Sequence, residues 1–171
     1  LAGLVGAGRT EVARAIIGAD PLLEGEVKLH GIARYIDHPQ RAYQLGLGYL
    51  PEDRKANGLF LEMNVAENIV ASHLGKVASN GFISNAQQRA IAQEYVQKLA
   101  IRTPSIQQKV INLSGGNQQK IILARWLMRN PAVFIVDEPT HGIDVGAKAE
   151  IYKILRDLAS KGIGILLISS E

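Results

Sequence analysis

Three segments of the sequence combine residue types and spacings that could bind a phosphate group and cleave it. The first is a glycine-rich stretch that runs into a helix start, where backbone N–H groups can point at a phosphate. It matches the phosphate-loop pattern, with Arg9 at the usual Lys position and Thr10 placed to bind Mg²⁺ through its hydroxyl. Its candidate phosphate-binding residues are Gly3, Gly6, Ala7, Gly8, Arg9, Thr10 and Glu11.

The Arg at position 9 leaves two interpretations of this segment open. A guanidinium keeps a positive charge near the terminal phosphates of a nucleotide, but it is planar and bulkier than the usual ammonium. The alternative is a glycine-rich turn between a strand and a helix that holds no ligand. The segment alone does not decide between them.

The second segment is an apolar strand that ends in two acids, Asp137 and Glu138. Ligands of open α/β sheets bind at the carboxyl ends of the strands. There Asp137 would hold Mg²⁺, and Glu138 would polarise an attacking water as a general base. The alternative is a pair of solvated acids at a strand end, which the phosphate loop earlier in the chain makes the weaker interpretation.

The third segment places Ser114, Gly115 and Gly116 at the start of a helix, with Gln118 close behind them. A serine hydroxyl and glycine N–H groups at a helix N-terminus can bind an anion. Taken alone, Ser-Gly-Gly is better explained as an ordinary capped helix. Its place between the two other segments makes the pattern specific.

The elements that must position these segments alternate between strands and helices. Crossover connections through helices imply a mostly parallel sheet, so the fold class is α/β. We expect one domain over 1–171 with an inserted helical subdomain at about 55–130. Strands are predicted at 25–29, 47–50, 132–136 and 163–168, helices at 10–17, 39–46, 65–72, 84–99, 113–128 and 145–159, and a loop at 52–58.

Composition and chain ends restrict the function classes. The 19 basic and 16 acidic residues give a net charge of +3 without any Lys/Arg block, so we expect no nucleic-acid partner. No cysteine is present, which excludes disulfides and thiolate metal sites. No apolar run approaches the roughly 20 residues that span a bilayer. The chain begins without Met and stops after an apolar run, so we expect a piece truncated at both ends.

The order of the motifs resembles the ATP-binding cassettes of ABC transporters over essentially the whole chain. This resemblance rests on the phosphate loop, on Leu-Ser-Gly-Gly-Asn-Gln-Gln at 113–119 and on Asp-Glu-Pro-Thr at 137–140. Residues 142–144 look like the loop that follows the catalytic acid of the family, and 48–54 lie where its Q-loop lies. The resemblance implies a P-loop NTPase fold that binds ATP and Mg²⁺, with Thr10 and Asp137 on the metal.

Three positions depart from the family pattern. Arg9 stands for the phosphate-loop Lys, Glu52 for the Q-loop Gln and Ser170 for the switch His. Together with Asn-Gln-Gln-Lys at 117–120, these departures resemble the second cassette of fused bacterial sugar importers (ribose, xylose, galactoside or autoinducer-2 type). By this resemblance the catalytic positions of the chain are Glu138, Ser170 and Glu52.

The resemblance also implies an asymmetric pair of cassettes. Ser114, Gly115 and Gly116 match the family signature fully and would serve the ATP of a partner cassette, with Gln118 beside them. The partner would be the first cassette of the same subunit or a second copy. The own ATP site is degenerate, and we expect slow hydrolysis there because Ser170 lacks the imidazole of the switch His.

Further partners follow from the same resemblance. An integral-membrane sugar permease would dock near 52–58 and 64–68, and a periplasmic sugar-binding protein would act indirectly. We therefore expect a peripheral protein on the cytoplasmic face of the bacterial inner membrane. The transported sugar is selected by these other chains and is not encoded here, and the adenine-stacking residue of the family lies upstream.

Two rival functions stay open at this stage. A soluble, non-transport ABC ATPase acting on nucleic acid would carry a basic stripe or an inserted arm. A non-hydrolysing nucleotide sensor is favoured by Arg9 and Ser170 and opposed by Glu138. A P-loop kinase-like enzyme has no use for the Ser-Gly-Gly helix.

Overall fold

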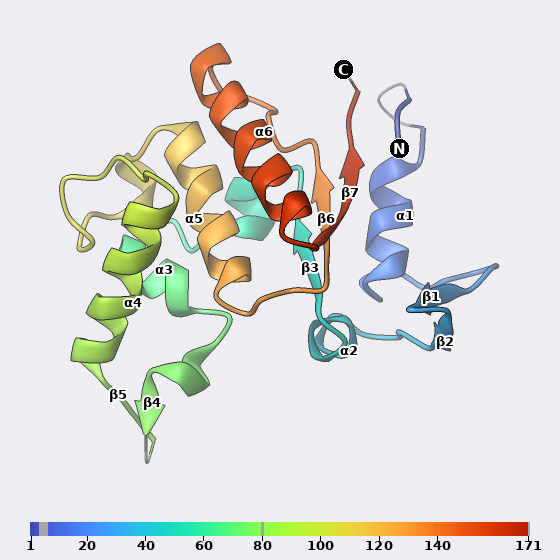
Figure 1. Cartoon of the computed structure of the whole chain (residues 1–171), viewed down its shortest axis with the longest axis horizontal. Helices are drawn as coiled ribbons and strands as arrows, with labels where there is room; N and C mark the ends of the chain where they lie inside the picture. Colours follow the sequence, from blue (N-terminus) through green and yellow to red (C-terminus); the bar gives the residue numbers. More distant parts are fainter. Residues whose placement is uncertain (4–6, 80, 171) are drawn as a thin grey trace.

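A three-stranded parallel sheet lies at the centre of the computed structural model, which describes residues 1–3, 7–79 and 81–170. Its strands are β3 (Leu47–Leu50), β6 (Val133–Asp137) and β7 (Gly164–Ile168), in the order β3-β6-β7. Ala2 continues the sheet beyond β7 through a parallel bridge to Ser169 (Figure 1). The predicted mostly parallel sheet is confirmed.

The sheet is buried on both faces, which explains the unbroken apolar run of its central strand. Side chains alternate between the two faces along β6. Phe134 and Val136 pack into a large core with α3, α4, α5 and α6, whereas Ile135 packs into a smaller core with α1 and α2. All three side chains are almost fully buried. The carboxyl end of β6 is therefore held rigidly between two cores.

Three of the helices start where a short polar side chain caps them. Ser84 caps α4 by accepting a hydrogen bond from Gln87 N, and Asp144 caps α6 by accepting one from Ala147 N. Asn64 caps the short helix α3. The helices are α1 (Arg9–Ile16), α2 (Pro39–Gln44), α3 (Val65–Val70), α4 (Asn85–Lys98), α5 (Gly115–Leu127) and α6 (Val145–Ser160), close to the predicted ranges.

The helices α3, α4 and α5 lie together on the side of the sheet away from α1 (Figure 1). Buried side chains from all three helices form one continuous core with α6, among them Ile69, Ala92 and Ile122. Between α3 and α4 the chain forms the 3₁₀ turn η2 (Leu74–Lys76) and a hairpin of β4 (Ala78–Ser79) and β5 (Phe82–Ile83). This hairpin was not predicted, because its strands are too short to show a period of two.

Two further differences from the predicted elements concern local turns. The segment expected to be a loop contains the π-helix η1 (Arg54–Gly58), whose first N–H groups are capped by Asp53. β1 (Val27–Leu29) forms an antiparallel hairpin with β2 (Ile32–Arg34), of which only the first strand was predicted. The 3₁₀ turn η3 (Val110–Asn112) leads into α5.

A buried arginine connects η1 to the helices behind it. Arg125 on α5 donates hydrogen bonds to the carbonyl oxygens of Gly58 and Asn68, each at 2.7 Å, and burial lowers its pKa to about 10. Arg125 thereby fixes the end of η1 against α3 and α5. Within the part of the chain that the structure describes, no helix is both long and apolar enough to cross a membrane.

Candidate functional site

A cavity of about 540 Å³ opens at the carboxyl end of the sheet. The start of α1, the loops after β3, β6 and β7, and the first turn of α6 contribute to its wall. Its volume lies in the range of small-molecule sites. The lining residues are Gly8, Arg9, Thr10, Glu11, Glu52, Glu138, Thr140, His141, Gly142, Ile143, Lys148 and Ser170.

The cavity brings together about half of the residues that the sequence singled out. Seven predicted site residues line it, namely Gly8, Arg9, Thr10, Glu11, Glu52, Glu138 and Ser170. Gly3 lies beside the Arg9 side chain, and Ala7 precedes α1 without lining the cavity. Gly6 lies outside the described residues.

The carboxylate of Asp137 lies fully buried at the end of β6. Its Oδ2 accepts a hydrogen bond from the hydroxyl of Tyr49 at 3.2 Å, and Thr10 contributes a second side-chain hydrogen bond. Its Oδ1 has no hydrogen-bond partner among the described residues. Burial raises the pKa of Asp137, although the bonds from Thr10 and Tyr49 oppose that shift.

A buried carboxylate oxygen without a partner fits a divalent cation. Mg²⁺ is usually held by one or two protein oxygens, with water and substrate phosphates completing an octahedron. Asp137 and Thr10 supply this kind of sparse oxygen set. The structure correspondingly shows no group of three or more His, Cys, Asp or Glu side chains that could form a full protein cage, within the residues it describes.

Arg9, the predicted phosphate ligand, and Glu138, the predicted general base, are paired with each other. Arg9 Nη2 lies 3.3 Å from Glu138 Oε1, and the two side chains are only 12% and 13% exposed. Arg9 Nη1 also donates to the carbonyl oxygen of Ser169. A phosphate that enters this cavity must therefore share Arg9 with Glu138, and a water molecule must share the Glu138 carboxylate with Arg9.

The backbone of Glu138 lies in the left-handed region, with φ at 42°. Such a conformation costs a non-glycine residue on the order of 1–3 kcal/mol and occurs often at functional sites. The N–H of Glu138 donates to Ile168 O at 3.0 Å, which ties the loop after β6 to β7. This bond holds Glu138 at the mouth of the cavity.

The predicted positions Glu52 and Ser170 lie on opposite sides of the cavity, after β3 and β7 respectively. Glu52 Oε1 is 3.9 Å from Nδ1 of His141, a contact that becomes an ion pair only when the imidazole is protonated. Both side chains are substantially exposed. Glu52 thus brings negative charge to the rim, and His141 is the imidazole closest to it.

The predicted signature residues lie at a different place. Ser114, Gly115 and Gly116 form the start of α5 and do not line the large cavity. Ser114 and Gly116 line a separate cavity of about 150 Å³, together with Asp144 and residues of α6. The structure therefore assigns the phosphate loop and the signature residues to two different surfaces of the domain.

Close packing explains why α5 begins with two glycines. A Cβ atom on Gly116 would lie 2.5 Å from the Ala147 side chain on α6, and one on Gly115 would lie 2.7 Å from Arg54 Nη2. Contacts this short are not tolerated without displacement. Gly116 therefore lets α5 approach α6 closely, and Gly115 leaves room for the Arg54 side chain.

Gln118 is directed into the protein. It is 4% exposed, its Nε2 donates to Val110 O at 3.0 Å, and its Oε1 accepts from Arg54 Nε at 3.3 Å. The geometry gives Gln118 an internal role in holding the start of α5. Its contact with a nucleotide stays a prediction.

Residues of the site that sequence reasoning missed include Tyr49, Arg54 and Lys148. Tyr49 lies within the Q-loop segment, and its pairing with Ile135 puts its hydroxyl beside the end of β6. Arg54 donates to the carbonyl oxygens of His141 and Gly142 at 2.7 and 3.2 Å, and so joins η1 to the loop after the acids. Lys148 adds a positive charge to the wall of the large cavity.

Comparison with known proteins decides the family. A profile described as ABC transporter matches residues 1–141. The chain belongs to the ABC transporter family. The match runs from the phosphate loop through the signature helix to the loop after the two acids.

Curated relatives cover almost all of this ABC transporter chain. It is 55% identical over 171 residues to the "Putative ribose/galactose/methyl galactoside import ATP-binding protein 1" of Agrobacterium fabrum. It is 52% identical over 169 residues to the "Ribose import ATP-binding protein RbsA 3" of Rubrobacter xylanophilus. Each alignment covers 99% of the chain and 34% of the relative, so the chain spans about a third of their length.

Solved structures show the same fold. The dimeric structure of MJ0796, a bacterial ABC transporter cassette, is similar with a TM-score of 0.80 at 23% identity, over 99% of this chain and 73% of that one. The ADP conformation of MJ1267, an ATP-binding cassette of an ABC transporter, gives a TM-score of 0.76 at 22% identity, over 99% and 68%. The predicted P-loop NTPase fold is confirmed by these cassettes.

Proposed function

We propose that this chain is an ATP-binding cassette that powers sugar import, as the second nucleotide-binding domain of a fused ABC importer subunit. The observation that carries the proposal is the separation of a phosphate-loop cavity from an intact signature helix within one fold. A cassette with two such surfaces contributes to two nucleotide sites. The curated relatives are named as import ATP-binding proteins, and each is about three times as long as this chain.

In the proposed own site, the chain binds the phosphates of ATP through the α1 start and Arg9. Thr10 and Asp137 would hold Mg²⁺, which supplies charge neutralisation between the phosphate oxygens when it is bound. Tyr49 orients the Asp137 carboxylate through its hydrogen bond to Oδ2, so that Oδ1 stays available. Burial and the neighbouring Asp137 charge raise the pKa of Tyr49, so its hydroxyl keeps its proton and remains a donor.

In our proposal, hydrolysis at the chain's own site is slow because the general base, Glu138, is already paired with Arg9. The ion pair between Arg9 and Glu138 is largely shielded from water, and its charges are therefore screened little by salt. A general base must reach the attacking water with its carboxylate oxygen. Ser170 stands where the family has an imidazole and offers a hydroxyl in its place.

The signature helix acts in trans in this proposal. Ser114 is exposed, and the N–H groups of Gly115 and Gly116 lie at the positive end of the 13-residue helix α5. These are the groups that stabilise a phosphate. Because they do not line the large cavity of their own chain, they would complete the ATP site of the first cassette, or of a second copy.

The permease would dock beside η1 and the start of α3. Phe60 and Met63 are about half exposed there, next to the exposed residues 55–57. Apolar side chains with a polar rim are the usual composition of a protein interface. The proposed location is the cytoplasmic face of the bacterial inner membrane, with a periplasmic sugar-binding protein acting through the permease.

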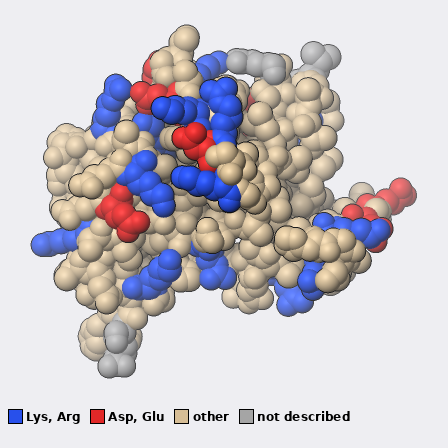
Figure 2. Space-filling model, viewed as in Figure 1, with Lys and Arg blue, Asp and Glu red and all other residues tan. Residues whose placement is uncertain are grey.

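The nucleic-acid alternative has little support from the surface. On the face seen in Figure 2, basic side chains lie in separate groups with acidic side chains between several of them. This face, as far as it is described, has no continuous basic stripe of the kind that follows a phosphate backbone. The non-hydrolysing alternative is favoured for the own site alone, by the Arg9–Glu138 pair.

The proposed function is tested by ATP hydrolysis of the fused subunit, assembled with its permease in proteoliposomes. We expect binding protein loaded with ribose, galactose or methyl galactoside to stimulate hydrolysis, with uptake of the same sugar. Asp137→Asn should weaken Mg-ATP binding at the own site. Hydrolysis that responds to none of these sugars, and instead to DNA or RNA, would contradict the proposal.

A further inference from the structure

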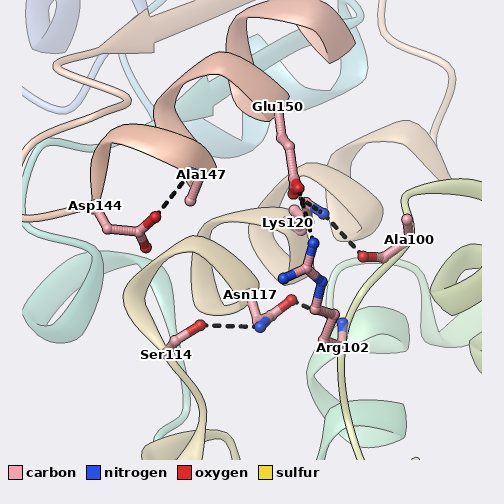
Figure 3. A network of polar contacts seen from close by, with 8 residues as sticks. All are labelled: Ala100, Arg102, Ser114, Asn117, Lys120, Asp144, Ala147 and Glu150. Carbon is pink, nitrogen blue, oxygen red and sulfur yellow. Dashed lines mark hydrogen bonds and ion pairs between the residues drawn. The ribbon is translucent and has the colours of Figure 1, made fainter.

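The side chain of Asn117 lies between a backbone N–H group and the hydroxyl of Ser114 (Figure 3). Its Oδ1 accepts a hydrogen bond from Arg102 N at 2.7 Å, and its Nδ2 donates to Ser114 Oγ at 2.9 Å. The first bond connects α5 with the segment that follows α4, and the second lies within the start of α5. Asn117 is therefore held at both ends of its amide.

These two contacts determine which group donates and which accepts in each of the two hydrogen bonds. A backbone N–H only donates, so it must face the amide oxygen of Asn117 and not the amide nitrogen. The Nδ2 group then faces Ser114, and because NH₂ only donates, Ser114 Oγ must accept. The hydrogen of the Ser114 hydroxyl consequently points away from Asn117.

The Arg102 N–H is itself held in place by a charged network. Lys120 is 3% exposed, and its Nζ donates to Ala100 O at 2.8 Å and lies 2.8 Å from Glu150 Oε2 on α6. The Arg102 side chain contacts the other oxygen of Glu150 at 3.1 Å. Ala100 has a left-handed backbone with φ at 47°, which is kept in place by this bond to Lys120. The segment 100–102 is thus fastened to both α5 and α6 (Figure 3).

We propose that Asn117 is a positioning residue that presets the Ser114 hydroxyl as a hydrogen-bond donor toward the phosphate of the partner cassette. The inference rests on the proposed function, in which Ser114 serves that nucleotide. Phosphate oxygens only accept hydrogen bonds, so a hydroxyl whose hydrogen is kept off Asn117 is available to donate when the phosphate arrives. Asn117 touches no nucleotide itself and acts through Ser114.

Replacement by aspartate reverses this arrangement with almost no change of shape. A carboxylate only accepts, so one oxygen of Asp would keep the bond from Arg102 N and the other would take the hydrogen of Ser114. The hydroxyl would then present a lone pair to the phosphate. The added negative charge lies in the first turn of α5, where it favours the helix, so Asn117→Asp should remain folded.

The test is steady-state ATP hydrolysis by the fused subunit carrying Asn117→Asp, Asn117→Ala or Asn112→Asp, each with Ser114 or with Ser114→Ala. Asn112 is exposed and lies just before the helix, so it adds the same charge without facing Ser114. We expect Asn117→Asp to lower kcat about 100-fold and Asn117→Ala about threefold, with KM changed less than kcat. Asn112→Asp should change kcat less than twofold, about the effect of a surface charge.

In the Ser114→Ala background, the substitutions at Asn117 should add less than about twofold, because the hydroxyl that they misdirect is gone. An equal effect of Asn117→Asp in both backgrounds, or an effect no larger than that of Asn112→Asp, would overturn the inference. If Ser114→Ala itself leaves kcat unchanged, the proposed trans role fails, and the inference fails with it. Thermal melting monitors the fold, and Asn117→Ala supplies the same cycle without added charge if Asn117→Asp melts early.

Discussion

The large cavity and the start of α5 differ in whether their polar groups are paired with each other or available to a ligand. In the cavity, the cation of Arg9 and the carboxylate of Glu138 are directed at each other 3.3 Å apart. At the start of α5, the network around Asn117 makes the Ser114 oxygen an acceptor toward Asn117 and leaves its hydrogen free for another acceptor. The charges in the cavity thus neutralise each other, whereas the Ser114 hydroxyl at the start of α5 can still donate to a ligand. One domain can therefore contribute unequally to two nucleotide sites.

The two regions also differ in what holds them. Glu138 is tied to β7 by one backbone hydrogen bond and has a strained φ angle. The start of α5 is held by Arg54, by Gln118 and by the close approach of Gly116 to α6. A pre-oriented donor stabilises a transition state most when the surrounding structure does not have to reorganise. This difference supports the proposal that α5 assists catalysis in trans and that turnover in the cavity is slow.

The largest effect is expected from removing the Ser114 hydroxyl. Ser114→Ala in the fused subunit should lower kcat about 100-fold, since one preorganised donor to a transition-state oxygen is lost. Hydrolysis of ATP at saturating Mg²⁺ measures it. Ser160→Ala, at the far end of α6, is the matched control, because its hydroxyl donates to Asp157 O within the same helix. If the kcat of Ser114→Ala stays within about twofold of wild type, the start of α5 does not support catalysis as proposed.

A second substitution should reduce the difference in ATP turnover between the own site and the site that Ser114 completes. Arg9→Lys restores the usual ammonium and releases Glu138 from the guanidinium, so the own site should gain activity. In the Ser114→Ala background, where the other site is silenced, we expect residual turnover to rise about tenfold. Arg14→Lys on the same helix is the control, as Arg14 contacts Asp20 outside the cavity. Unchanged residual turnover would show that the Arg9–Glu138 pair does not limit this site.

A smaller effect is expected at Tyr49. Tyr49→Phe removes one hydrogen bond to Asp137 Oδ2, which is worth about 1 kcal/mol, or about fivefold in Mg-ATP affinity at the own site. Binding of a fluorescent ATP analogue with and without Mg²⁺ measures it. Tyr43→Phe is the control, because the Tyr43 hydroxyl donates to Ser72 O away from the cavity. An equal loss in both variants would indicate a packing effect instead.

Much of the fold followed from the sequence, because its elements obey local rules. The apolar run of β6 and the caps at Ser84 and Asp144 each determine their element within a few residues. The π-helix η1 did not follow, because its geometry depends on contacts of Arg54 and Arg125 with segments far along the chain. Local composition does not encode such contacts.

The candidate site shows the same division. The glycine-rich loop and the acids of β6 could be found from their spacing alone. The pairing of Arg9 with Glu138 could not, since the two lie at opposite ends of the chain and meet only in the folded sheet. The function of Asn117 was equally hidden, because it depends on the N–H of Arg102. Spacing identified the groups, and only their contacts show which of them are available to a ligand.

The most direct test of the asymmetry is Mg-ATP hydrolysis by the fused subunit, wild type against Glu138→Gln. We predict a total turnover within about twofold of wild type, because most hydrolysis takes place at the site that Ser114 completes in trans. A fall of about tenfold or more would contradict this prediction, since it would show that the site containing Glu138 carries the hydrolysis.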